Sequence, residues 1–162
     1  MIYIRPFKKE DFLAFKPIEP LPEEEIYDEV LAQQIEDSGL AVTGIRDGKV
    51  VGCGGVHPQI DTSQGEIWLR ISRECLRFKI ESLITLKKAL AIIEEVYPFE
   101  RLNAVVKSRF KQSNKLAQYL GFTLAQSVMH NGEEWDIYTK LVSGEKNDNK
   151  NSKHELKPQG CI

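Results

Sequence analysis

The segments Gly65-Glu66-Ile67-Trp68-Leu69-Arg70-Ile71-Ser72 and Arg77-Phe78-Lys79-Ile80-Glu81-Ser82 decide the fold. The first segment begins near a carboxylate and continues with mostly apolar residues, which is typical of a strand in a sheet. The second leads directly into Ile80 to Val96, where leucine and isoleucine recur at helical spacing. A strand, a short connection and a helix N-terminus in this order place a candidate base and an anion-binding helix end on one side of a sheet.

Strand and helix patterns alternate on both sides of this central unit. Asp47-Gly48 and Asn131-Gly132 are typical hairpin turns, and Gly39 and Gly121 are typical helix ends. Glycines at positions 52, 54 and 55 weaken that strand and indicate a bulge or the close approach of another backbone or a ligand. The expected strands are 2–5, 40–46, 49–56, 65–72, 101–106, 122–129 and 135–142, and the expected helices are 8–15, 22–38, 80–96 and 113–120.

The composition is that of one ordinary globular domain, with 41% hydrophobic residues, 28% charged residues and a net charge of −2. Its 22 lysines and arginines are balanced by 24 acids spread along the chain, so nucleic acid is not an expected partner. Lys107, Arg109 and Lys111 form a small basic cluster, for which a solvated loop is the simpler interpretation. The 3 cysteines lack a C-x-x-C spacing and suggest neither a disulfide framework nor a zinc site.

The two ends of the chain carry further expectations. The N-terminal residues have a strand pattern without the apolar core of a signal peptide, and no run is long enough to span a bilayer, so membrane placement is not expected. A reducing, cytoplasmic location is expected instead. Residues 143–162 are almost without apolar side chains and are predicted to form a disordered tail after one domain at 1–142.

From Ile2 to Val142 the order of elements resembles the fold of the GNAT acetyltransferases. The resemblance implies an α/β (α+β) fold, in which a mixed, mostly antiparallel sheet of about seven strands is flanked by about four helices. It also implies that the fourth and fifth strands lie parallel and splay apart, and that acetyl-CoA enters between them. Glu66 stands where that family often has a catalytic glutamate, and Arg77 matches the first position of its Gln/Arg-x-x-Gly-x-Gly/Ala phosphate loop.

Acetyl-CoA is therefore the implied co-substrate, without a metal. Its implied contacts come from the end of the fourth strand, the segment that follows and the helix near residue 113: Leu69, Arg70, Ile71, Arg77, Phe78, Lys79, Ile80, Glu81, Ser82 and Ser113. Ile80 stands where the family has a glycine or small residue, so it is expected to obstruct the loop amides, and Glu81 is expected to repel phosphate. Basic side chains such as Arg77 and Lys79 are an alternative means of holding phosphate, and a merely solvated basic loop is the other interpretation.

The acid and base of the implied reaction are only partly present. Partial burial would make Glu66 a base that removes a proton from an amine, whereas a solvated glutamate at a strand end is the alternative. Ala117 occupies the position of the family's general-acid tyrosine, and Tyr119 is expected to face elsewhere on the helix. Tyr138 on the last strand, or a water molecule, is the expected substitute. His57 is a weaker candidate at the substrate end of the cleft.

The sequence therefore predicts direct transfer of an acetyl group from acetyl-CoA to a small-molecule or protein amine. The alternative is a catalytically inactive GNAT-fold protein used for binding or associated with a virion, which Ile80, Phe110 and Ala117 favour. Ile4-Arg5-Pro6 and Tyr119-Leu120-Gly121-Phe122 are similar to patterns in small GNAT-like proteins of tailed bacteriophages. The expected compartment is then the cytoplasm of a bacterium or of a phage host, and a homodimer is an open alternative to a monomer.

Overall fold

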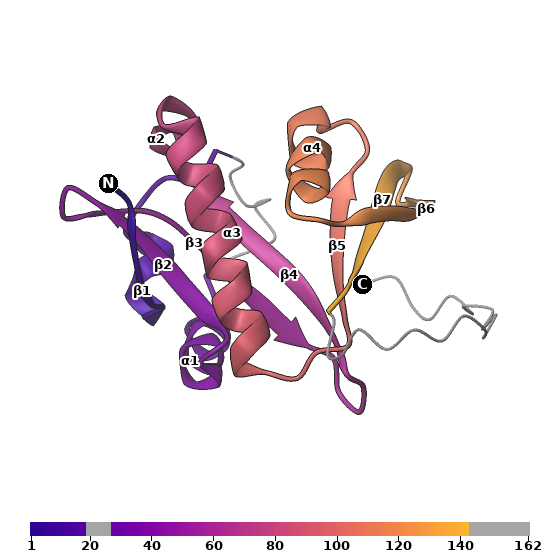
Figure 1. The fold of residues 1–162 in the computed structure, drawn as a ribbon, viewed down its shortest axis with the longest axis horizontal. Coiled ribbons are helices and arrows are strands. Elements are labelled where there is room, and N and C mark those ends of the chain that lie inside the picture. Colours follow the sequence, from indigo (N-terminus) through magenta and orange to yellow (C-terminus); the bar gives the residue numbers. More distant parts are fainter. Residues whose placement is uncertain (19–26, 143–162) are drawn as a thin grey trace.

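The computed structural model describes residues 1–18 and 27–142 of the chain. Within them, seven strands form one sheet in the order β1-β2-β3-β4-β5-β7-β6 (Figure 1). The strands are β1 (Tyr3–Pro6), β2 (Ala41–Arg46), β3 (Lys49–Pro58), β4 (Gln64–Ile71), β5 (Arg101–Lys107), β6 (Thr123–His130) and β7 (Glu133–Leu141). The helices are η1 (Lys9–Leu13, a 3-10 helix), α1 (Glu29–Ser38), α2 (Arg73–Arg77), α3 (Lys79–Val96) and α4 (Lys111–Tyr119). The predicted α/β fold class is confirmed, and the predicted tail lies outside the described residues.

The parallel neighbours β4 and β5 separate after a short contact. Their pairing consists of Gln64 with Arg101, Gly65 with Leu102 and Glu66 with Asn103. Beyond that point the rest of β4 and the rest of β5 run on without pairing to each other. The sheet is therefore divided into a first lobe, β1 to β4 with α1 to α3, and a second lobe, β5 to β7 with α4 (Figure 1).

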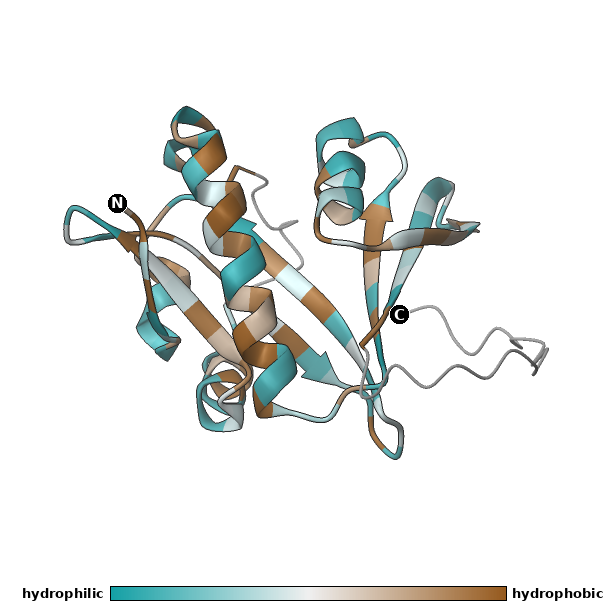
Figure 2. Cartoon of the chain, in the orientation of Figure 1, coloured by the Kyte–Doolittle hydropathy of each residue, from teal (hydrophilic) through white to brown (hydrophobic). Residues whose placement is uncertain are grey.

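The two faces of the first lobe carry different helices. On one face, Ile93 of α3 shares a buried cluster with Ile67 of β4. On the other, Ile35 of α1 and Phe12 of η1 share a separate cluster with Trp68. Adjacent residues of a strand point to opposite sides, so Ile67 and Trp68 mark what we call the α3 face and the α1 face. Figure 2 shows the matching alternation of hydrophobic and hydrophilic residues along β4 and α3.

The hairpin turns lie where the sequence predicts them. Asp47, Gly48, Asn131 and Gly132 have φ angles of 49°, 74°, 50° and 75°. Two consecutive residues with positive φ form the type I′ turn, whose twist matches that of the flanking strands. These two turns set the β2–β3 and β6–β7 hairpins, so local sequence alone determines one of the three antiparallel pairings in the first lobe and one of the two in the second.

The glycines of β3 allow a neighbouring backbone to come close. A Cβ atom on Gly55 would lie 2.3 Å from the carbonyl oxygen of Leu40, which no side chain can tolerate without moving the backbone. The register of β2 and β3 also shifts here, because Gly44 pairs with Gly52 and Ile45 pairs with Val50, which leaves Val51 of β3 as the extra residue of a bulge. Both expectations are therefore met, with a bulge beside Gly52 and the close approach of a backbone at Gly55.

Helix α1 begins later than the sequence indicates. Asp28 is its N-cap, and its carboxylate accepts hydrogen bonds from the amides of Val30 and Leu31 at 2.9 and 3.2 Å. The expected start at Pro22 lies outside the described residues. Tyr27, the first described residue after Pro22, is not helical. An aspartate that satisfies two first-turn donors is a stronger start signal than a proline followed by acids, which explains the shorter helix.

The predicted phosphate loop between Arg77 and Ser82 is not a loop. α2 ends at Arg77 and α3 begins at Lys79, with Phe78 between them. The amide of Ser82 already donates to the Phe78 carbonyl at 2.9 Å, as the first bond within α3. Because no glycine opens this segment, Phe78 alone, with φ −118° and ψ 52°, leaves the helical region, and two helices meet where a loop was expected.

Candidate functional site

The gap between β4 and β5 exposes a strand edge. Along β3 and β4, residue pairs that exchange backbone hydrogen bonds alternate with pairs that do not. The bond of 2.9 Å from the Ser72 amide to β3 identifies which residues of β4 belong to the hydrogen-bonded pairs. The Ile67 amide still belongs to the pairing of Glu66 with Asn103, whereas the Ile67 carbonyl, the Leu69 amide and carbonyl, and the Ile71 amide point into the gap. The Ile71 carbonyl on the same side accepts from the Ile18 amide at 2.9 Å. Such an edge can pair with an extended ligand that carries amides, as an added strand would.

A row of polar side chains crosses the sheet where β4 and β5 part. The strand register places His57, Glu66, Asn103 and Thr139 side by side on β3, β4, β5 and β7. Neighbours in such a row have Cβ atoms about 5 Å apart, and this row lies on the α1 face. The sequence analysis missed Asn103, although an asparagine within an otherwise apolar strand is a signal that could have marked it.

Glu66 lies at the apex of the gap and is half-buried. Burial raises the pKa of its carboxyl group, and no nearby positive charge opposes the shift. Burial also lowers the pKa of His57, whose ring stacks on Trp68 with the centroids 5.7 Å apart. A carboxylate with a raised pKa, next to an imidazole held neutral, is suited to accept a proton from an amine.

The N-terminus of α3 lies beyond the end of β4. The amides of its first turn, from Lys79 to Glu81, precede the first intrahelical hydrogen bond and are available to an anion. The Glu81 carboxylate accepts a hydrogen bond from the Ile2 amide and forms an ion pair with Arg46. Burial acts to raise the pKa of Glu81, but these contacts outweigh it and lower that pKa. Arg46 thus offsets the negative charge that was expected to repel phosphate.

Two of the predicted cofactor contacts have structural roles instead. Ser82 is buried, and its hydroxyl donates to the Cys75 carbonyl at 3.1 Å, which fixes α3 against α2. The Arg46 guanidinium lies over the Phe78 ring, with its carbon 3.4 Å from the ring centre. Ile80, by contrast, is 77% exposed in the first turn of α3. Ile80 belongs to the same turn as the free amides, and its obstruction of them stays a prediction.

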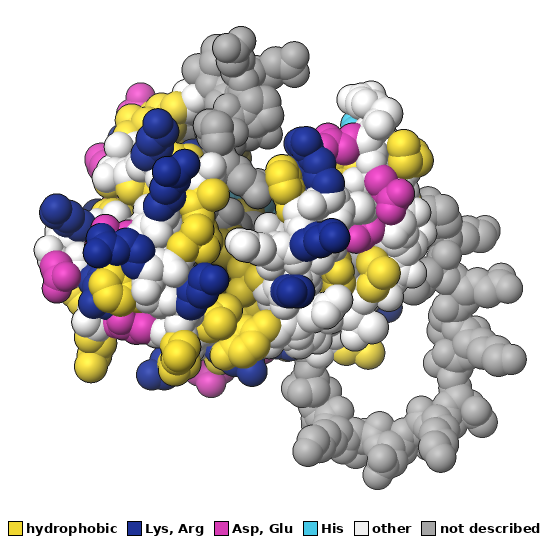
Figure 3. Space-filling view, turned by 90° about the horizontal axis from the view of Figure 1, so that it is seen from above, with side chains coloured by type: hydrophobic (Ala, Val, Ile, Leu, Met, Phe, Trp, Pro, Cys, Tyr) yellow, Lys and Arg dark blue, Asp and Glu magenta, His cyan; other side chains and the backbone are white. Residues whose placement is uncertain are grey.

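Basic side chains surround the open end of the gap. Because β4 and β5 are parallel, the segment after β4, with Arg73, Arg77 and Lys79, lies at the same end as Lys111 after β5. These four side chains are exposed, and none has an ion-pair partner in the part of the chain that the structure describes. Figure 3 looks onto this end and shows Lys and Arg on both sides of a hollow between the lobes. Open sheets bind ligands beyond the carboxyl ends of their parallel strands, and here that end is positively charged.

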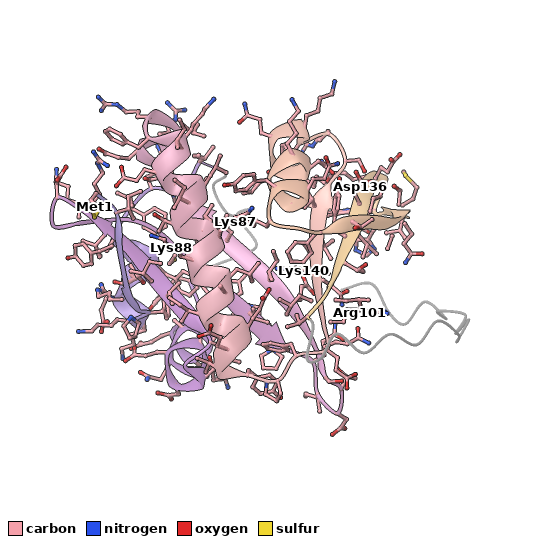
Figure 4. The ribbon with its side chains drawn as sticks, in the orientation of Figure 1. Met1, Lys87, Lys88, Arg101, Asp136 and Lys140 are labelled. Atoms are coloured by element: carbon pink, nitrogen blue, oxygen red, sulfur yellow. The ribbon has the colours of Figure 1, made fainter. Side chains whose placement is uncertain are left out.

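Two contacts join the lobes on the α3 face. Lys87 Nζ of α3 lies 4.5 Å from the ring centre of Tyr119 of α4, and Lys140 Nζ of β7 donates to Glu94 Oε1 at 2.8 Å. Figure 4 shows Lys87 and Lys140 between α3 and the second lobe. The same residues line a cavity of about 310 Å³. Tyr119 is therefore engaged with α3 rather than turned into the core of the second lobe.

Tyr138 lies in the core and does not fit the general-acid role predicted for it. It is 2% exposed, and its hydroxyl donates to Asn114 Oδ1 at 2.7 Å. Asn114 donates in turn to the Phe110 carbonyl at 2.8 Å, so Tyr138 anchors the first turn of α4. Ser113, in the same turn, is half-buried. The partner of Tyr138 comes from another element, which a strand pattern alone does not reveal.

Arg70 lies on the opposite face from the other predicted cofactor contacts. Arg70 and Cys53 form one of the hydrogen-bonded residue pairs of β3 and β4, so the Arg70 amide points toward β3 and away from the gap. Its guanidinium carbon lies 5.1 Å from the ring centre of Phe12, on the α1 face. Leu69 and Ile71 thus present their amides to the gap, and Arg70 between them does not, because successive strand residues alternate.

Solved structures of acetyltransferases superpose on this chain, whereas no protein-family model and no curated protein matches it. An N-acetyltransferase from Staphylococcus aureus Mu50 has a TM-score of 0.71 at 17% identity, covering 88% of this chain and 99% of its own. A ribosomal-protein-S5-alanine acetyltransferase from Vibrio fischeri has a TM-score of 0.70 at 13% identity, covering 90% and 96%. A GNAT-family acetyltransferase from Streptococcus pneumoniae has a TM-score of 0.67 at 14% identity, covering 88% and 100%.

The described residues contain no helix that is both long enough and apolar enough to cross a membrane. Across residues 1–18 and 27–142, no group of three or more His, Cys, Asp or Glu is placed to hold a metal ion. The splayed β4 and β5, the sheet order and the extent of the superpositions agree with one another. The chain has the fold of the GNAT acetyltransferases.

Proposed function

We propose that this protein is an N-acetyltransferase that moves the acetyl group of acetyl-CoA to an amine by direct attack. The observation that carries the proposal is the free edge of β4 at Ile67 and Leu69, with the half-buried Glu66 at the apex of the gap. The solved structures that share this fold are named as acetyltransferases, which supports the class of reaction.

The residues around the gap fit acetyl-CoA as a co-substrate, which supplies an acetyl group activated as a thioester. Its pantetheine arm carries amides that suit pairing with the Leu69 carbonyl and the Ile71 amide. Its phosphates suit the first-turn amides of α3 and the side chains of Arg73, Arg77 and Lys79. Charged side chains therefore take the place of the glycine loop that this chain lacks.

The chemistry assigned to the chain is one proton transfer and one polarisation. Glu66 removes a proton from the ammonium form of the acceptor, directly or through water, because only the neutral amine has a lone pair for attack. The Leu69 amide, the free amide of β4 nearest Glu66, donates to an acyl oxygen as it gains negative charge. The carbon–nitrogen bond forms and the carbon–sulfur bond breaks, which releases a thiolate. Because an ordinary thiol has a pKa of about 8.5, the thiolate leaves near neutral pH without a tyrosine to protonate it.

Acetyl-CoA is expected to raise the melting temperature of the protein. At a hundredfold excess over Kd, a ligand at one site adds about 2.7 kcal/mol to the free energy of unfolding. The double variant Arg77→Ala with Lys79→Ala should show a smaller shift, whereas Lys49→Ala, in the exposed β2–β3 turn, should behave as wild type. Thermal melting measures the shifts, and free-thiol release from acetyl-CoA plus an amine measures transfer. No shift at millimolar CoA contradicts the proposal.

A binding protein or virion-associated protein on the same scaffold is the second candidate function. The helical segment in place of the phosphate loop and the buried Tyr138 favour it. The state of Glu66 favours the enzyme, because a half-buried carboxylate whose pKa is raised without a partner is a typical mark of a functional site. Binding of CoA without any turnover would decide for the second candidate.

A further inference from the structure

Arg70 has no structural explanation in the fold or in the binding of acetyl-CoA. Its guanidinium lies on the α1 face, the same face as the Glu66 carboxylate. The Arg70 Nε atom is buried with no hydrogen-bond partner, and the side chain forms no ion pair with any described residue. Buried polar groups in proteins are nearly always paired, so this one calls for a partner other than the described residues.

One neighbour of Arg70 on the same face is unpaired as well. Trp68 lies two residues earlier in β4, and its Nε1 is also buried without a hydrogen-bond partner among the described residues. Alternate residues of a strand share one face and follow one another at about 6.7 Å. An unpaired indole donor beside a guanidinium is suited to a carboxylate, which only accepts hydrogen bonds.

The surroundings hold Arg70 without neutralising it. Its guanidinium carbon lies 5.1 Å from the centre of the Phe12 ring, which packs against Trp68 at 5.5 Å and Tyr27 at 6.3 Å. Asp11, the buried carboxylate of the same helix η1, is already bound by an arginine of β1 and a threonine of β2. The guanidinium therefore remains an available positive charge against an aromatic wall.

We propose that Arg70 binds a carboxylate of the acceptor, and that the acceptors of this protein are amines that also carry a carboxylate. This inference rests on the proposed function, because it takes the amine to lie at Glu66. The Cα atoms of Glu66 and Arg70 are about 13 Å apart along β4, and both side chains are long enough to shorten that span. A linear acceptor can then reach from one to the other across the apolar surface of Phe12 and Trp68.

A pair of amines that differ only in a terminal carboxylate tests this inference. We expect ε-aminocaproate to exceed hexylamine about 10- to 100-fold in kcat/KM, and Arg70→Met to abolish that preference while acetyl-CoA binding is unchanged. Arg70→Lys keeps the charge and should restore part of the preference. Lys16→Met removes an exposed charge after η1 and should leave the preference intact. A preference that survives in Arg70→Met overturns the inference.

Calorimetry separates this inference from the proposed function. Each amine is titrated into protein saturated with CoA, which measures acceptor binding without any transfer. Tighter binding of ε-aminocaproate that is lost in Arg70→Met supports the role of Arg70 even when no amine is acetylated. Equal binding of the two amines, or no binding of ε-aminocaproate, overturns it. If CoA itself does not bind, that result contradicts the proposed transfer reaction and not the role of Arg70. The binding of the two amines to the protein without CoA then decides the role of Arg70.

Discussion

Replacing Glu66 with glutamine is expected to slow acetyl transfer by about 10²- to 10⁴-fold at neutral pH. Glutamine keeps the shape of the side chain and its place in the strand, so the fold and the affinity for CoA should be retained. The loss should shrink at high pH, where the amine gives up its proton unaided. Steady-state kinetics followed by thiol release measure the effect, and turnover at the wild-type rate would reduce Glu66 to a strand-end residue without a chemical role.

The pH dependence gives the Glu66→Gln variant a second signature. Burial raises the pKa of Glu66, so the wild-type rate should fall, as the pH is lowered, already above the pH at which an exposed glutamate titrates. The pKa of Glu66 is higher in the folded protein than in the unfolded chain. As the pH rises through the pKa of the folded protein, Glu66 therefore lowers the free energy of unfolding of the wild type. The variant should therefore melt higher than the wild type at neutral pH and equally in acid. Glu134→Gln, exposed on β7, is the matched control and should change neither the rate nor the melting temperature.

Replacing Asp11 with alanine is expected to lower the free energy of unfolding by about 3–5 kcal/mol. The Asp11 carboxylate is 4% exposed and accepts hydrogen bonds from Arg5 at 2.7 and 2.8 Å and from Thr43 at 2.6 Å. It joins η1 to β1 and β2, and η1 carries the Phe12 ring on which Arg70 lies. Removing the carboxylate leaves a guanidinium and a buried hydroxyl unpaired, which is the source of the large cost. Denaturant unfolding followed by circular dichroism measures it.

The stability effect of Asp11→Ala should depend on pH in a defined direction. Burial alone would raise the pKa of Asp11, but hydrogen bonds from Arg5, Thr43 and the Lys8 amide together lower it. The contribution of the group is therefore present above its unfolded pKa of about 3.9 and is lost as the pH falls through the folded value. The variant and the wild type should converge in acid. Glu10→Ala, the exposed neighbour, should change stability by no more than about 0.5 kcal/mol, and a similarly small effect for Asp11→Ala would contradict the assigned role.

The sequence predicted those parts of the fold that local chemistry controls. The turns at Asp47 and Asn131 follow from two-residue loops that require positive φ, whereas the arrangement of the strands in the sheet was expected from the resemblance to the GNAT fold. The start of α1 and the segment after β4 were not predictable in the same way. At the start of α1, a helix cap outweighed the pattern of a proline followed by acids. After β4, the absence of a glycine left the segment helical, although the resemblance to a loop-containing family favoured a loop.

The candidate site could be predicted only where the backbone places it. Glu66, Leu69 and Ile71 lie at the gap because the pairing of β4 with β5 ends there. Tyr138 lies in the core because its partner Asn114 comes from a different element. Arg70 was expected among the cofactor contacts, but its amide points to β3 and its side chain lies on the α1 face. Which amides of β4 face the gap depends on which residue pairs of β3 and β4 are hydrogen-bonded, and composition or spacing does not reveal that.

The amide chemical shifts of isotope-labelled protein, recorded during titration with CoA, test most directly the claim that the free edge of β4 is the cofactor site. The structure predicts an alternating response along the strand, with shifts at Leu69 and Ile71 that exceed those at Trp68 and Arg70, whose amides bond to β3. The first-turn amides of α3, from 79 to 81, should respond as well. Shifts confined to other surfaces at millimolar CoA, or a response without alternation along β4, would contradict the account.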